Sequence, residues 1–335
     1  MPVSLSDADR AAASSEPSPD YPGAMTAAPV RRLMVIGGAE NKLGRARVLR
    51  RFVRLAGGST ARIVLLPTAS SVPDEMVAMY TEVLGRLGVR TVTAVAPTNR
   101  LQCDHPSLTT PLEQATGIFM TGGNQLKLAQ VIAGTAVAQA VHDAYLRGCI
   151  VAGTSAGASI MSSHMISMGD EGVTPRQRSS QLSAGLGLLP DVVIDQHFDQ
   201  RGRYGRLLSL VAQSPSLLGM GIDEDTAALV TDGRRLEVLG AGGVFLVDAS
   251  RALSDAHEAR QGAALLVSGA VVHSLPSGAR FDLATRRLLG FVQQRRDVAI
   301  STAHQDRDEA TITARSLRDA EAAGSRTLRA AAVDD

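Results

Sequence analysis

The sequence predicts an α/β fold built on a doubly wound, mostly parallel sheet with extra antiparallel strands in its C-terminal part. Two observations support this prediction. Short apolar runs alternate with segments of helical spacing through the first half of the chain, and most of these runs end at a Gly or Thr turn. Strands that are buried on both faces are continuous apolar runs, which is typical of a parallel sheet covered by helices on each side.

The expected elements follow in chain order. The parallel strands are expected at residues 33–36, 63–66, 91–95, 117–120 and 149–152. Helical spacing between them predicts helices at residues 45–56, 77–87, 125–132 and 137–147. Later in the chain we expect strands at 192–194 and 219–222 around a helix at 202–213. Alternation with several glycines predicts antiparallel strands within residues 227–247, with short strands at 244–247, 265–267 and 270–273.

A single α/β domain, residues 31–300, is expected to hold all of these elements. Residues 1–30 are rich in Ala, Ser, Pro and Asp and lack the basic and apolar regions of a signal peptide, so we expect a disordered leader there. Residues 301–335 form a charged, Ala-rich tail, which is either a solvated helix or disordered.

The composition argues against several classes of function. The formal net charge is +1 over 335 residues, so no overall field attracts nucleic acid or a membrane surface. Aromatic residues make up only 3%, which argues against a base-stacking platform, and no apolar run approaches the roughly 20 residues that span a bilayer. Cys103 and Cys149 are interpreted as buried small hydrophobic residues. We therefore expect a cytoplasmic protein that binds neither nucleic acid nor membrane.

A candidate nucleophile lies between a buried strand and a helix. The sequence Gly-Thr-Ser-Ala-Gly at residues 153–157 matches the G-x-S-x-G pattern of a nucleophile elbow. Such a turn needs small flanking residues, because the serine hydroxyl must project over the end of the sheet. The alternative interpretation of Ser155 is a helix-capping serine. Ser159, Ser162 and Ser163 lie further along the expected helix and are interpreted as structural.

A second glycine turn, residues 121–125, also ends a buried strand. If the two strands are neighbours, backbone N–H groups near Gly123 and at Ala156 can form an oxyanion hole, and Gln125 can bind substrate. The alternative is a glycine-rich helix start without a ligand.

Residues 195–206 are the densest polar segment, and they directly follow the apolar strand at 192–194. His197 therefore has the position expected of a general base at a strand end. Arginine binds carboxylates in a planar, bidentate way, so the arginines of this segment indicate an acidic ligand. The three arginines are Arg201, Arg203 and Arg206. The alternatives are a solvated basic helix start and a metal site formed by Asp195, His197 and Asp199, but no second ligand group supports the metal site.

Three acids follow the next apolar strand, and one of them is expected to orient the histidine. They are Asp223, Glu224 and Asp225, and the residues alone leave open which one acts. The resulting order of serine, histidine and acid differs from the common α/β-hydrolase order. The mismatch favours a different doubly wound scaffold with the same chemistry.

With these motifs in view, roughly residues 31–272 resemble the cyanophycinase family among the serine peptidases of the dipeptidase E type. The segments that carry the resemblance are residues 35–40, 121–125, 153–158, 193–198, 200–203, 205–208 and 221–227. The resemblance implies a sandwich like the class I glutamine amidotransferases, which is flavodoxin-like, and a homodimer. It also implies that Glu224 orients His197. The substrate-binding residues that it implies are Gln125, Asp195, Gln196, Arg201, Arg203 and Arg206.

The implied activity is that of a serine exopeptidase. Its substrate is cyanophycin, a poly-aspartate backbone with an arginine on each side-chain carboxylate, and its product is the β-aspartyl-arginine dipeptide. We expect no metal or organic cofactor. Two alternatives remain: a dipeptidase of the same family that acts on α-aspartyl peptides, and a non-catalytic binder of acidic peptides. The polar segment at residues 174–183 is interpreted as a lid over the site.

Overall fold

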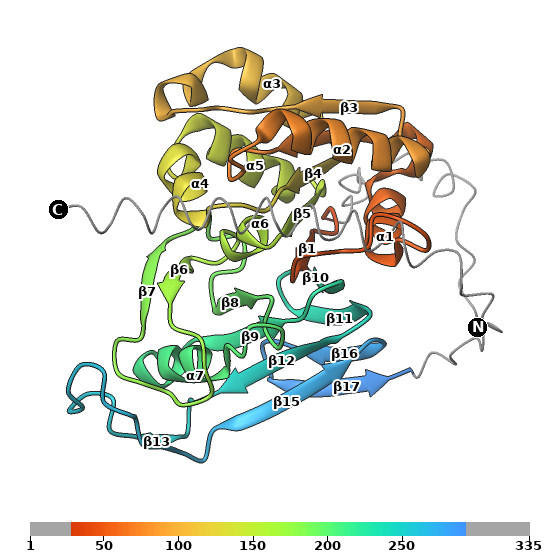
Figure 1. Ribbon diagram of the computed structural model, residues 1–335. Helices are drawn as coiled ribbons and strands as arrows, with labels where there is room; N and C mark the ends of the chain where they lie inside the picture. The colour runs from red at the N-terminus through yellow and green to blue at the C-terminus, as the bar shows by residue number, and fades with distance from the viewer. Residues whose placement is uncertain (1–27, 293–335) are drawn as a thin grey trace, which may run out of the picture.

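The computed structural model describes residues 28–292 and confirms the mixed α/β fold. Its larger sheet has nine strands in the order β17-β16-β11-β10-β1-β5-β4-β2-β3 (Figure 1). Five neighbouring strands run parallel, as the apolar runs predict. These strands are β1 (Arg32–Ile36), β2 (Arg62–Leu66), β3 (Thr91–Ala94), β4 (Gly117–Met120) and β5 (Ile150–Thr154).

Helices cover both faces of this sheet (Figure 1). Ile63 and Leu65 of β2 pack in one cluster with the first two helices, whereas Val64 and Leu66 pack in another with the next three. Full burial of such a side chain stabilises by about 1.5–3 kcal/mol, so both faces of the strand must be apolar. The helices are α1 (Arg47–Ala56), α2 (Pro73–Arg86), α3 (Pro106–Gln114), α4 (Gln125–Ile132) and α5 (Ala136–Leu146), with 3-10 turns η2 (Gly58–Thr60) and η3 (Arg100–Asp104).

The predicted antiparallel strands extend the other side of the larger sheet. β10 (Thr226–Thr231) pairs with β1, and β11 (Arg235–Gly240) pairs with β10. β16 (Ala279–Asp282) and β17 (Arg287–Phe291) complete that edge, although the sequence pattern did not predict these last two strands.

The expected strand at 192–194 belongs to a second sheet, which the sequence pattern did not distinguish from the first. This smaller sheet has four strands in the order β15-β12-β9-β8. Their bounds are β8 (Val192–Gln196), β9 (Leu218–Ile222), β12 (Gly243–Asp248) and β15 (Val271–Pro276). β8 and β9 are parallel and are joined through α7 (Tyr204–Gln213). Apolar periodicity identifies a strand but does not assign it to a sheet, since both sheets bury the same kind of face.

One local expectation was wrong. The helix after Ser155, α6, covers only Ala156–Ser159, so Ser162 and Ser163 lie beyond it. Part of the polar 174–183 segment enters a hairpin of β6 (His164–Gly169) and β7 (Ser180–Ala184), and its role as a lid stays a prediction. A smaller pair is formed by β13 (Leu253–Ser254) and β14 (Val267–Ser268).

Most of the expected leader and all of the expected tail lie outside the described residues. Within residues 28–292, the structure has no helix that combines the length and the apolar character needed to cross a membrane.

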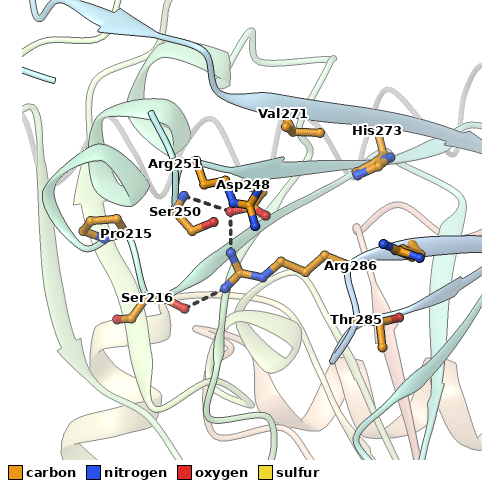
Figure 2. Close-up of a pocket in the computed structure, with 10 residues that line it drawn as sticks. Pro215, Ser216, Asp248, Ser250, Arg251, Val271, His273, Thr285 and Arg286 are labelled. Carbon is orange, nitrogen blue, oxygen red and sulfur yellow. Dashed lines mark hydrogen bonds and ion pairs between the residues drawn. The ribbon is translucent and has the colours of Figure 1, made fainter. Parts of the chain in front are cut away.

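An ion pair joins the two sheets beside a surface hollow of about 460 Å³ (Figure 2). Arg286 lies in the turn between β16 and β17 of the larger sheet, and its guanidinium binds Asp248 at the end of β12 in the smaller sheet. It also donates to the Ser216 carbonyl oxygen at 2.8 Å. Asp248 pairs with Leu218, at the start of β9, so this contact lies at the end of the smaller sheet away from Ile222.

Replacing Arg286 by Ala is expected to lower the free energy of unfolding by about 1–3 kcal/mol, because it leaves a largely buried carboxylate without its cation. Urea unfolding at pH 7 measures the change. Arg287→Ala is the matched control, because Arg287 is the next residue and is exposed. Equal losses in the two variants would contradict the assignment.

The same comparison has an expected pH dependence. Burial raises the pKa of Asp248, but hydrogen bonds from Ser250 and the charge of Arg286 lower it more, so it lies below its ordinary value of 3.8. The stabilisation is therefore complete above pH 3.8 and is lost as the pH falls through the lowered pKa. The gap between the wild type and Arg286→Ala is expected to shrink over that acidic range.

Candidate active site

Ser155 follows β5 in a strained turn. Its backbone has φ 52° and ψ −110°, a conformation that side chains other than glycine rarely adopt. The flanking glycines are required by close packing, since a Cβ at Gly153 would lie 2.1 Å from the Gly157 carbonyl oxygen. A Cβ at Gly157 would lie 2.3 Å from the Met120 carbonyl oxygen. The turn therefore has the geometry of a nucleophile elbow, in which strain presents the hydroxyl at the end of the sheet.

His197 follows β8 and meets Ser155 from the smaller sheet. The Ser155 Oγ atom lies 2.9 Å from His197 Nε2. The His197 backbone N–H donates to the Gly37 carbonyl oxygen at 2.8 Å, which fixes the end of β8 against the end of β1. The imidazole also packs on Gly38, where an added Cβ would lie 2.3 Å from the ring. The end of β8 thus places an imidazole beside the Ser155 hydroxyl, and it does so from the smaller sheet.

Of the three acids after β9, Glu224 is the one that binds the imidazole. Its Oε1 atom lies 2.7 Å from His197 Nδ1. Asp223 instead accepts from the Gly243 backbone N–H at 2.9 Å. Asp225 accepts from the Asn41 backbone N–H at 2.8 Å. The contact with His197 therefore favours Glu224 among the three acids.

The electrostatics favour a neutral His197. Burial lowers its pKa, the hydrogen bond that it donates to Glu224 raises it, and the net result is a pKa below the ordinary 6.5. In neutral His197, the Nδ1–H group donates to Glu224 Oε1, and Nε2 then accepts from the Ser155 hydroxyl. This tautomer is the one that a general base for serine requires.

The second glycine turn lies beside the elbow, because β4 and β5 are neighbours. A Cβ at Gly122 would lie 3.4 Å from the Ser155 Cβ and 3.9 Å from its Oγ. Within residues 28–292, the backbone N–H groups of Gly123 and Ala156 donate to no other group of the chain. Both are therefore available to a ligand next to the serine, which is what an oxyanion hole needs.

The two amides of the predicted site are held by neighbours. Gln125 donates from Nε2 to the Ile166 carbonyl oxygen at 2.8 Å, which connects α4 to β6. Gln196 accepts at Oε1 from Arg203 Nη1 at 2.6 Å. The sequence pattern placed Asp195 and Gln196 after the strand at 192–194. In the structure both residues lie within β8.

Two of the three predicted arginines are directed at a carboxylate of the chain itself. Arg206 Nε donates to Asp195 Oδ2 at 2.6 Å, and Arg203 Nη1 donates to Asp195 Oδ1 at 3.3 Å. Asp195 is fully buried and both guanidinium groups are nearly so. Burial lowers the pKa of Arg203 to about 10, although Asp195 opposes the shift. Arg201 is exposed, so it alone of the three presents its side chain to solvent.

The metal alternative is not supported by these contacts. Asp195 binds the two arginines, and His197 binds Ser155 and Glu224. Asp199 accepts from the Tyr204 hydroxyl at 2.7 Å. In the described part of the chain, no group of three His, Cys, Asp or Glu side chains comes together as metal ligands would.

Sequence reasoning missed Glu40, which lies directly beneath the elbow. Its carboxylate accepts from the Thr154 hydroxyl at 2.5 Å, one residue before Ser155. Its signals were its place in the segment 35–40, which carries the family resemblance, and its place after the glycine turn at residues 37–38, but neither assigned it a role. A single glutamate in a loop is usually exposed to solvent, so the sequence did not indicate that Glu40 is buried.

Comparison with known proteins decides the family. The model of peptidase family S51 matches residues 33–238, a range that contains Ser155, His197 and Glu224. The chain belongs to peptidase family S51.

Curated proteins similar to this S51 chain are named cyanophycinase. The protein of Trichormus variabilis is 40% identical over 265 residues, which cover 78% of the chain and 89% of that protein. The protein of Geminocystis herdmanii is 35% identical over 265 residues, or 78% of the chain and 97% of that protein. The protein of Thermosynechococcus vestitus is 40% identical over 217 residues, or 64% of the chain and 67% of that protein.

A solved structure shares the fold. The crystal structure of a peptidase from an acI-B1 Actinobacterium has a TM-score of 0.56 and 20% identity, and the match covers 76% of this chain and 97% of that one. Together the comparisons confirm the expected family, and the chain is a serine peptidase of the S51 type with the predicted α/β fold.

In a Ser155→Ala variant, the His197 imidazole is expected to titrate with a pKa below 6.5, because burial outweighs the effect of Glu224. NMR of the imidazole protons against pH measures this, and the His197 signals are assigned by their loss in a His197→Gln variant. Adding Glu224→Gln is expected to lower the pKa further, since the carboxylate raises it. A pKa of 6.5 or higher in the single variant would contradict the account.

Proposed function

We propose that this S51 peptidase is an exopeptidase that hydrolyses cyanophycin to β-aspartyl-arginine dipeptides, with Ser155, His197 and Glu224 as its catalytic triad. The observation that carries the proposal is the continuous chain of contacts from Ser155 to His197 at 2.9 Å and from His197 to Glu224 at 2.7 Å. The names of the curated relatives support the choice of substrate.

The proposed mechanism follows from that geometry. Ser155 attacks an aspartyl carbonyl carbon while neutral His197 accepts its proton at Nε2. The N–H groups of Gly123 and Ala156 stabilise the oxyanion. His197 then protonates the leaving amine, and water hydrolyses the acyl-enzyme by the same route. Glu224 holds the imidazole in the required tautomer and stabilises its charged form.

We propose that the arginines of the segment 201–206 select a substrate with free carboxylates. Arg201 binds a carboxylate directly, since its guanidinium is exposed. Arg203 and Arg206 share the buried carboxylate of Asp195, and the half-exposed Glu171 carboxylate lies 4.0 Å from Arg203, so Arg201 is the cation of the three that supports direct binding of a substrate carboxylate. Gln125 and Gln196 complete the proposed binding residues. Hydrogen bonds between arginine and a carboxylate are strong and need a defined geometry, so they favour substrates that place a carboxylate at that position.

We further propose a cytoplasmic, homodimeric enzyme without a cofactor. The chain supplies a nucleophile, a base and oxyanion donors, so the mechanism needs no metal or organic cofactor. Both cysteines of the chain are buried free thiols, which fits a reducing cytoplasm. A homodimer is proposed on the family resemblance.

Ser155→Ala is expected to abolish turnover of cyanophycin, because no other group can form the acyl-enzyme. Incubation with insoluble cyanophycin followed by mass spectrometry of the soluble products measures this. Ser163→Ala is the matched control, since that serine lies beyond the elbow helix and is expected to retain full turnover. Unchanged turnover in Ser155→Ala would refute the proposed nucleophile.

The same assay separates the alternative activities. Release of β-aspartyl-arginine by the wild type supports the proposal. Cleavage of α-aspartyl dipeptides with no action on cyanophycin would instead identify an aspartyl dipeptidase. Failure of Ser155 to react with a fluorophosphonate probe would identify a non-catalytic binder.

Arg201→Ala is expected to raise KM for cyanophycin by about 10-fold or more, since a hydrogen bond to a charged group contributes about 1.5–3 kcal/mol. The turnover number is expected to change little, because the contact is made away from the reacting bond. Arg90→Ala is the control, as Arg90 is exposed and lies before β3. An unchanged KM in Arg201→Ala would remove Arg201 from the proposed binding site.

A further inference from the structure

A buried carboxylate lies beneath the nucleophile elbow. The Glu40 side chain is fully buried, and it comes from the loop between β1 and α1. Its Oε2 atom accepts from the Thr154 hydroxyl at 2.5 Å, and its Oε1 atom accepts from the Tyr80 hydroxyl at 2.5 Å. The ammonium group of Lys42 lies 3.0 Å from Oε1. A buried charge is costly unless it is paired and hydrogen-bonded, and here each oxygen has a donor.

The carboxylate is ionised at neutral pH. Burial raises the pKa of Glu40, but Lys42, Thr154 and Tyr80 lower it more, so the pKa lies below the ordinary 4.5. Burial and the nearby Glu40 charge raise the pKa of Tyr80 well above 10, so that hydroxyl keeps its proton and donates. The two hydroxyl contacts are thus charge-assisted hydrogen bonds, which are stronger than neutral ones.

The loop that carries Glu40 also touches the histidine and the acid. Its Gly37 carbonyl oxygen accepts from the His197 backbone N–H. Its Gly38 carbonyl oxygen accepts from the Asp225 backbone N–H at 2.9 Å, next to Glu224. One short loop therefore contacts His197 itself and the residues next to Glu224 and Ser155, and Glu40 is its contact with Thr154.

We propose that Glu40 is a positioning residue that holds Ser155 in its reactive conformation through Thr154. The proposal rests on the proposed triad. A strained backbone such as that of Ser155 costs about 1–3 kcal/mol and persists only where neighbouring contacts hold it. The Ser155 backbone N–H is held by the Ile36 carbonyl oxygen at 3.1 Å, and the residue before it is held by Glu40. Without the second contact, the turn relaxes and Ser155 Oγ moves relative to His197.

Substitutions on the two sides of Glu40 separate an effect on the position of Ser155 from an effect on the stability of the fold. Thr154→Val removes the hydroxyl but keeps the shape, whereas Thr154→Ser keeps the hydroxyl. Glu40→Gln removes the charge. Tyr80→Phe removes a donor on the far side of the carboxylate, from α2, and leaves the Thr154 contact in place. A purely structural role predicts equal effects on both sides of Glu40, but a positioning role predicts that only the Thr154 side affects the serine.

The test measures the rate at which a fluorophosphonate probe labels Ser155, together with kcat and KM on cyanophycin. Thr154→Val and Glu40→Gln are expected to lower the labelling rate and kcat by about 10- to 100-fold with KM within about twofold, because small displacements of a nucleophile cost that much. Thr154→Ser is expected to restore most of the rate. Tyr80→Phe is expected to keep the labelling rate within about threefold while lowering the melting temperature.

The labelling assay tests the role of Glu40 separately from the proposed substrate. Labelling needs no cyanophycin, so a wild type that is labelled but does not cleave the polymer refutes the substrate and still tests Glu40. Unchanged labelling in Thr154→Val and Glu40→Gln, or an equal loss in Tyr80→Phe, overturns the positioning role. If Thr154→Val does not fold, Glu40→Gln against Tyr80→Phe decides the question. A wild type that the probe does not label overturns the triad and this inference together.

Discussion

The hydrogen bond from the His197 backbone N–H to the Gly37 carbonyl oxygen joins the two sheets where the candidate triad forms. Ser155 belongs to the larger sheet, and His197 and Glu224 follow strands of the smaller one. The 2.9 Å contact between Ser155 Oγ and His197 Nε2 therefore depends on how the two sheets pack. Gly38 makes that close packing possible, since any side chain there would occupy the space of the imidazole.

Much of the fold could be predicted from the sequence because the central strands are buried on both faces. Such strands are short continuous apolar runs, and their length and the glycine, proline or threonine turns that end them distinguish them from buried helices. The pattern failed where burial is one-sided. β17 has mostly exposed residues, and α3 contains Pro111, so neither has a clear periodic signal. Assignment of β8 to a second sheet also lay beyond the pattern, because strand order is a property of long-range contacts.

The site could be predicted to a similar extent. Ser155, His197 and the acid group were found because each follows an apolar strand, and parallel strand ends gather functional residues. The choice of Glu224 came from family resemblance, and the structure supplies its geometric reason. Arg203 and Arg206 could not be distinguished from Arg201, because nothing in the sequence indicates that Asp195 is buried between the first two. Glu40 escaped notice for the same reason, since its partners are distant in the chain.

The division of the triad between sheets has a consequence during synthesis. Ser155 and the strands β1 to β5 around it precede His197 and Glu224 in the chain, so they leave the ribosome first. A serine without its base is a weak nucleophile. For the proposed triad, cleavage therefore requires the later strands to dock onto the earlier ones, and a polypeptide that ends before residue 197 carries a dormant hydroxyl.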